Sequence, residues 1–118
     1  WAGSYFLPRV VGIAKACELI FTGESIDAAE ALRLGIVNAV VAPEELMNAA
    51  YSLARKIASG APVAVAISKR AIYHNQEVDL RAALEFETFA QSVCKDTEDH
   101  KEGVKAFVEK RAPVFRGR

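Results

Sequence analysis

The sequence predicts a mainly α-helical protein with one short strand. Apolar residues recur at intervals of three and four along most of the 118 residues, which is the spacing of a helix with one buried face. Glycine, proline or a capping residue stands at the end of nearly every such run. The strand is predicted at residues 36–41, IVNAVV, because β-branched residues dominate there.

The composition is that of a folded globular domain, with 52% hydrophobic and 25% charged residues. Fifteen basic residues balance fifteen acidic ones, so the chain lacks the net positive charge that favours nucleic-acid binding. No apolar run approaches the roughly 20 residues needed to cross a bilayer. We therefore expect neither a nucleic acid nor a membrane as a partner, and we expect a cytoplasmic location.

The chain opens with Trp1, and its only methionine is Met47. No signal-peptide pattern accounts for such a start, so we expect the sequence to be part of a longer protein. Cys17 and Cys94 lie far apart and lack metal-ligand spacing. Each is expected to be a small buried hydrophobic residue, and a disulfide is the less favoured alternative.

The first 23 residues predict two helices. Ser4 is a suitable N-cap for a short first helix, and Pro8 is tolerated near its start because first-turn N–H groups have no helical partner. Gly12 ends that helix. Residues 13–21 repeat the helical spacing, and Gly23 ends the second helix.

A third helix is predicted before the strand. Asp27 is expected to cap it, and Glu30 to return a hydrogen bond to the cap in a capping box. Gly35 ends this helix, because glycine takes the left-handed conformation without strain. The strand at residues 36–41 follows, and Pro43 closes it.

Four more helices are predicted after the strand, at residues 43–58, 62–75, 80–94 and 97–111. Asp79 is expected to cap the third of these, and Asp96 or Thr97 the fourth. Pro113 ends the last helix, and residues 114–118 are expected to trail off.

Two of these helices have apolar faces that matter for packing. The helix at 62–75 is expected to bury Val65, Ile67, Ala71 and Ile72. The helix at 80–94 carries a broad apolar band made of Leu80, Ala83, Leu84, Phe86, Phe89, Ala90, Val93 and Cys94. That band is wider than one neighbouring helix requires, so a second subunit is a candidate partner for it.

No catalytic or metal-binding constellation stands out. His74 and His100 lack a second ligand at helical ligand spacing and are expected to be surface residues. No two glycines are adjacent, so no glycine-rich loop is available to hold a phosphate. Glu85 and Glu87 point in different directions on a helix. Glu87 could face the apolar side, where a salt bridge with Arg81 or another arginine is favoured over catalysis.

Four segments of the chain, in order, resemble one family. They are GSYFLPRVVG at 3–12, A-x-E-L-x-F-T-G at 16–23, A-A-E-A-L-R-L-G-I-V-N-x-V-V at 28–41 and E-G-V-K-A-F-V-E-K-R-x-P-x-F-x-G-R at 102–118. Together they resemble the C-terminal part of the crotonase superfamily, which includes enoyl-CoA hydratases and isomerases. Ala2-Gly3 departs from the Gly-Gly that members commonly have.

The resemblance implies that residues 1–41 end a spiral core of β-β-α units and that 42–118 form a C-terminal helical, oligomerisation region of a crotonase-like fold. It implies an acyl-CoA substrate, a homo-oligomer (a trimer or dimer of trimers) and no cofactor. Members stabilise a thioester enolate with two backbone N–H groups, and hydratases add water with two glutamates. Those groups precede the equivalent of Trp1, so neither a catalytic residue nor a metal ligand is expected here.

Two positions remain as substrate-binding candidates. By motif, Phe107 and Lys110 match a phenylalanine and a lysine that lie near bound CoA in family members, sometimes across a subunit boundary. Lys110 would meet a CoA phosphate, and Phe107 would form an apolar wall. The structural alternatives are a core phenylalanine and a lysine favoured by the end of a helix.

Two functions are therefore open at this point. The resemblance implies a C-terminal fragment of a crotonase-type enoyl-CoA hydratase or isomerase, which supplies oligomer contacts and an edge of the CoA site and is inactive by itself. The wide apolar band at 80–94 also suits a free-standing α-helical interaction module without catalytic activity.

Overall fold

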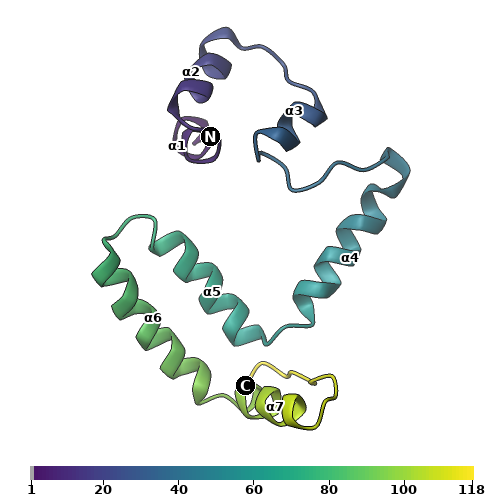
Figure 1. Ribbon diagram of the computed structural model, residues 1–118, viewed down its shortest axis with the longest axis vertical. Helices are drawn as coiled ribbons and strands as arrows, with labels where there is room; N and C mark the ends of the chain where they lie inside the picture. The colour runs from purple at the N-terminus through teal and green to yellow at the C-terminus, as the bar shows by residue number, and fades with distance from the viewer. Residues whose placement is uncertain (1) are drawn as a thin grey trace. The chain divides into compact units, whose positions relative to one another are not determined.

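The computed structural model describes residues 2–118, and helices dominate it (Figure 1). Seven α-helices and one short 3-10 helix form in these residues, so the predicted mainly helical fold class is confirmed. The chain divides into two compact units, Trp1–Ala49 and Ala50–Arg118. Within residues 2–118, none of the helices combines the length and the hydrophobicity that a bilayer crossing requires.

The first unit begins with a pair of packed helices, α1 (Gly3–Val11) and α2 (Ile13–Thr22). Ala16 of α2 is buried, and its small side chain allows close approach of a neighbouring backbone. The predicted cap at Ser4 is wrong. The helix α1 already begins at Gly3, and no side chain caps it.

The third helix, α3 (Ala28–Arg33), starts as predicted, but Glu30 does not make the predicted contact. Asp27 accepts a hydrogen bond from the Glu30 N–H at 2.7 Å, so the predicted N-cap is confirmed. Glu30 does not complete the capping box. Both of its oxygens accept hydrogen bonds from Arg33 at 2.6 Å instead, and this ion pair lowers the pKa of Glu30.

The predicted helix ends at glycine are confirmed in this unit. Gly23 has φ of 64° and Gly35 has φ of 76°, both in the left-handed region. At Gly35 the glycine N–H donates to the Leu32 carbonyl at 3.0 Å, and the Ile36 N–H donates to the Ala31 carbonyl at 2.9 Å. This paired arrangement satisfies the last carbonyl groups of α3.

The predicted strand at residues 36–41 does not form. Residues 36–38 bend and the following residues have no regular structure. The N–H groups of Ile36 and Val37 both donate hydrogen bonds to the Ala31 carbonyl in α3. A strand needs a second strand to complete its hydrogen bonds, and none of the described residues supplies one. β-branched composition alone is therefore not sufficient here.

Four α-helices follow the irregular segment. They are α4 (Leu46–Ala58), α5 (Pro62–His74), α6 (Leu80–Lys95) and α7 (Glu98–Val108). A short 3-10 helix, η1 (Pro43–Glu45), leads directly into α4. Asp79 accepts a hydrogen bond from the Ala82 N–H at 2.9 Å, and Thr97 accepts one from the His100 N–H at 3.1 Å. The predicted cap at Asp79 is confirmed, and Thr97 rather than Asp96 caps α7.

In the second unit, α5 and α6 lie side by side, and α6 also contacts α7 (Figure 1). Ile67 and Ala71 of α5 are half-buried, as predicted. Val65 and Ile72 are exposed, so the predicted burial of those two residues is wrong. Only one strip of α5 is covered by α6, which is narrower than the apolar face that the sequence provides.

The buried core of the described residues is small. Its buried apolar residues are Ala16, Ala90 and Ala106, and its buried charged residue is Asp99. Every α-helix leaves at least one large apolar side chain exposed. Cys17 and Cys94 are free thiols and only half-buried. The helices thus carry much more apolar surface than these two units cover.

We expect Gly35→Ala to lower the free energy of unfolding by about 1 kcal/mol, because an L side chain is strained in the left-handed region. Gly103→Ala is the matched control. Gly103 lies inside α7, and a Cβ there would meet the Phe115 ring at 3.6 Å, an ordinary contact. That variant should gain up to about 1 kcal/mol from better helix propensity. Equal losses for both variants in denaturant unfolding of the native protein would contradict this prediction.

Candidate functional site

The C-terminal end of α7 brings the two predicted substrate-binding residues together. Phe107 lies in the last turn with 84% of its surface exposed, so it is not a core residue of this unit. The helix ends at Val108, three residues before the predicted end. Lys110 follows that end, and its N–H donates to the Phe107 carbonyl at 3.3 Å. The two residues therefore occupy one helix terminus.

Lys110 has an unusual backbone conformation. Its φ is 54°, in the left-handed region that side-chain-bearing residues seldom adopt. Such a conformation costs about 1 kcal/mol. The bond to Phe107 and a bond from the Arg111 N–H to the Ala106 carbonyl at 3.0 Å hold it. The Lys110 side chain is exposed and forms no ion pair with any residue between 2 and 118.

A groove of about 410 Å³ runs along α7 and includes Phe107. It is contained in the second unit, and the start of α5, the end of α6, α7 and the C-terminal tail all contribute to it. Its lining is largely apolar or small: Ala61, Ala64, Cys94, Thr97, Asp99, His100, Gly103, Val104, Phe107 and Phe115. Lys110 lies three residues beyond Phe107, so a cation follows an exposed ring that lines an apolar groove. This combination suits a ligand with an apolar part and a negatively charged part.

The tail that follows α7 is held in place, so the prediction that residues 114–118 trail off is wrong. Asp99 Oδ1 accepts a hydrogen bond from the Arg116 N–H, and Oδ2 accepts one from the Gly117 N–H, both at 2.7 Å. The Asp99 N–H donates to the Arg118 carbonyl at 3.1 Å. Asp99 is 3% exposed. Its charge is stable there because backbone donors replace water.

Glu102 makes a second attachment to the tail. It accepts two hydrogen bonds from Arg111, at 2.6 and 2.9 Å, and one from the Val114 N–H at 2.9 Å. These bonds, with the Arg111 guanidinium as the main cause, lower the pKa of Glu102 to about 2. The same contacts, together with Glu109, raise the pKa of Arg111. The residue directly after Lys110 is therefore fixed to α7.

The opposite charges beside α7 do not cancel. A second groove of about 470 Å³ contains five cationic and three acidic side chains: Lys101, Lys105, Arg111, Arg116, Arg118, Glu98, Asp99 and Glu102. The acids are already engaged, since Glu98 pairs with Arg118 at 3.0 Å and Glu102 with Arg111. This side of α7 therefore carries a net positive charge.

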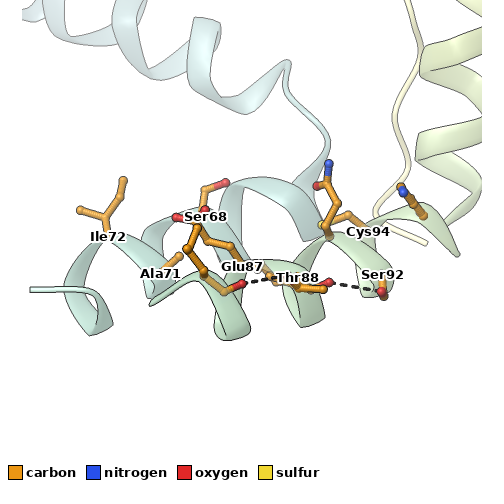
Figure 2. A pocket seen from close by; sticks show the side chains of 12 residues that line it. Ser68, Ala71, Ile72, Glu87, Thr88, Ser92 and Cys94 are labelled. Carbon is orange, nitrogen blue, oxygen red and sulfur yellow. Dashed lines mark hydrogen bonds between the residues drawn. The ribbon is translucent and has the colours of Figure 1, made fainter. Parts of the chain in front are cut away.

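The depression between α5 and α6, about 640 Å³, is larger, and three of its polar side chains are already hydrogen-bonded (Figure 2). The Thr88 hydroxyl donates to the Leu84 carbonyl at 2.8 Å, and the Ser92 hydroxyl donates to the Thr88 carbonyl at 3.2 Å. Glu87 accepts a hydrogen bond from the Asn75 side chain at 3.2 Å. The two hydroxyls are thus bonded within α6, and Glu87 connects α6 to the residue that follows α5.

The remaining titratable residues of the sequence search do not form a site. Glu85 pairs with Arg81 at 3.1 Å in solvent, so the Glu87–Arg81 pair does not form. Glu87 is exposed rather than inward-facing. His74 and His100 are exposed, which confirms that prediction. Within residues 2–118, no three metal-ligating side chains come together.

Sequence analysis did not single out Asp99, Glu102 or Phe115. The sequence does contain a signal, because three acids, Glu98, Asp99 and Glu102, stand in the first two turns of α7 and a glycine follows at position 103. Acidic residues in a first turn also interact favourably with the helix dipole. The pattern alone therefore does not distinguish a helix stabilised by its dipole from one that anchors the chain's C-terminal tail.

Comparison with known proteins decides the family. A sequence profile described as enoyl-CoA hydratase/isomerase matches residues 1–118. This chain belongs to the enoyl-CoA hydratase/isomerase family. It is 50% identical to the short-chain-enoyl-CoA hydratase of Clostridium acetobutylicum over 111 residues, which cover 94% of the chain and 42% of that protein. It is 45% identical to the (E)-benzylidenesuccinyl-CoA hydratase of Thauera aromatica, covering 98% of the chain and 45% of that protein.

Solved structures of the same family match the fold. The crystal structure of an enoyl-CoA hydratase from Bacillus anthracis superposes with a TM-score of 0.95 and 42% identity, covering 98% of this chain and 45% of that one. The chain thus spans less than half the length of these enoyl-CoA hydratases. The resemblance seen in the sequence is confirmed, and the helices described here correspond to one part of the crotonase fold.

Because the pKa of Glu102 is low, we expect the stabilisation that Glu102 gives to the folded protein to decrease in acid. An unfolded carboxyl with the ordinary pKa of 4.5 takes up its proton before the folded one, whose pKa is about 2. The stabilisation is therefore complete above pH 4.5 and is lost as the pH falls towards 2. We expect the difference in melting temperature between the native protein and Glu102→Gln to shrink across this interval.

Glu85→Gln is the control, because Glu85 sits in an exposed pair with Arg81. Its difference from the native protein should remain small at every pH. A Glu102→Gln difference that stays constant from pH 7 to pH 3 would show that Glu102 does not link the tail to proton uptake.

Proposed function

We propose that this chain is part of an enzyme that acts on acyl-CoA thioesters by the hydratase or isomerase chemistry of its family, and that Phe107 and Lys110 form an edge of the CoA site. The observation that carries the proposal is the exposed phenylalanine and the unpaired lysine at one helix terminus. Residues 42–118 would then be the helical region that borders the substrate.

The two side chains match the two halves of such a ligand. CoA combines apolar and amide segments with phosphate groups. Phe107 offers a flat apolar surface beside a largely apolar groove. Lys110 offers a single cation with no carboxylate partner among the described residues, next to a side of α7 that is already net positive. A phosphate near Lys110 would therefore be attracted without first displacing an ion pair.

Catalysis itself is assigned to other residues of the polypeptide. Glu85 is paired with Arg81 and Glu87 with Asn75, so these two acids of α6 do not act together on a common substrate position. We propose that this part of the chain positions substrate and that, isolated, it has no hydration activity.

The test is hydration of a short-chain enoyl-CoA by the native protein. Lys110→Ala should raise KM about twofold to fivefold and leave kcat unchanged, since an exposed charge contact contributes modestly to binding. The effect should weaken at high salt because the contact is electrostatic. Lys69→Ala is the matched control, an exposed lysine on α5 away from the groove, and its KM should not change.

Lys110→Gly separates binding from backbone strain. It should lose the same affinity as Lys110→Ala, while its melting temperature should rise because glycine relieves the left-handed conformation. If the native protein hydrates enoyl-CoA and Lys110→Ala and Lys110→Gly have the same KM as the Lys69→Ala control, Lys110 does not belong to the substrate site. No turnover of any acyl-CoA by the native protein would remove the proposed function.

We further propose that α6 contributes to a homo-oligomer, a trimer or a dimer of trimers. The centre of its apolar band faces its neighbours in the chain, since Ala90 is buried and Phe86 lies 4.8 Å from the His74 ring. Leu84 on one flank is 54% exposed, and Phe89 on the other is 68% exposed. A second subunit that covers these flanks would remove large apolar side chains from water.

Phe89→Asp tests this interface. Burying a carboxylate among apolar side chains costs several kcal/mol, so the native assembly should dissociate to a smaller species. Light scattering after size exclusion measures that mass. Lys69→Asp is the control, because Lys69 is already polar and exposed and lies on α5, outside the apolar band of α6. An unchanged mass for Phe89→Asp would exclude this face from the interface.

An intact-mass measurement of the native polypeptide by mass spectrometry distinguishes the alternative function. A free-standing helical interaction module would have an intact polypeptide mass of 12.8 kDa, the mass of this chain. A substantially larger native polypeptide supports the enzyme.

A further inference from the structure

We infer that Asp99 is a positioning residue for the substrate groove: by holding the C-terminal tail against α7, it keeps Phe115 in place as a wall of that groove, which Phe107 also lines. This inference rests on the proposed function, because it assigns the groove to an acyl-CoA. Asp99 itself lines the groove but does not need to contact the ligand to act in this way.

Asp99 attaches the C-terminal tail firmly to α7. The tail has neither helix nor strand, so its own backbone does not fix it. Asp99 binds two successive tail N–H groups with its two oxygens, both at 2.7 Å, and donates its own N–H to Arg118. Charge-assisted bonds of this length are the stronger kind. A buried carboxylate that lost these donors would be left without solvation, so release of the tail is costly.

The attachment of the tail fixes the position of Phe115. Phe115 is the residue directly before the two whose N–H groups Asp99 binds. Its ring passes over Gly103, where an added Cβ would lie 3.6 Å away, an ordinary contact. The ring therefore lies against this turn of α7. From there Phe115 lines the same groove as Val104 and Phe107.

The tail also lies close to the start of α5, another part of the groove. Gly117 has φ of 76°, and a Cβ there would lie 3.5 Å from Pro62 at the start of α5. The tail thus runs between α7 and the beginning of α5, and Ala61 and Ala64 of that segment also line the groove. Without the Asp99 attachment, the ligand would have to order this wall as it binds, which weakens affinity.

The test compares hydration kinetics of a short-chain enoyl-CoA for the native protein, Asp99→Asn, Phe115→Ala and the double variant. In Asp99→Asn one oxygen becomes an NH2 group, which faces a tail N–H and cannot accept its hydrogen bond. We expect KM to rise about fivefold or more in each single variant, with kcat retained. The double variant should be no worse than either single one, because both remove the same wall.

Glu98→Gln is the matched control. Glu98 also contacts the tail, but through an exposed pair with the Arg118 side chain, and it does not line the groove. Its KM should match that of the native protein. Hydrogen exchange supplies an independent readout, since the Arg116 and Gly117 amides should exchange faster in Asp99→Asn and not in Glu98→Gln.

The outcomes are distinguishable. Faster exchange of the tail amides with an unchanged KM would overturn the inference and leave the proposed function intact. Independent, additive effects in the double variant would also overturn it. If Asp99→Asn fails to fold, Phe115→Ala decides, because a normal KM there means that the ring is not part of the binding groove. Absence of turnover by the native protein would instead reject the proposed function itself.

Discussion

The second unit of this chain depends on one buried carboxylate. Removing a charge from water is costly unless hydrogen-bond donors replace the solvent. Asp99 has such donors only because the tail returns to the first turn of α7 and presents two backbone N–H groups to it. The carboxylate and the tail therefore stabilise each other, and the groove along α7 acquires a wall that no helix or strand supplies.

A second constraint is the amount of apolar surface that the helices carry. The buried apolar residues of the described chain are three alanines, whereas large side chains such as Phe89 and Phe107 are exposed. Surface of this kind is usually covered by another subunit, another part of the polypeptide or a ligand. The family relationship is consistent with all three, because the chain spans less than half the length of its relatives. The helices are thus better understood as one side of a larger core.

The end of α7 shows how local strain and function can coincide. Lys110 occupies a left-handed conformation in which glycine would cost less. The two backbone bonds at the helix end and the Arg111–Glu102 pair on its far side hold it there. A lysine retained at such a position supplies a charge that glycine lacks. That is the physical reason to look to this residue for a ligand contact.

The sequence by itself determined the helices, most of their ends and the family. Asp27, Asp79 and Thr97 cap helices through contacts three residues away, and Gly35 ends one through its own backbone freedom. Local interactions of this kind can be read from spacing. Only the tertiary structure decided that residues 36–41 form no strand and that the tail is anchored rather than loose. Both depend on whether a distant segment completes the hydrogen bonds of the backbone, and spacing along the chain does not contain that information.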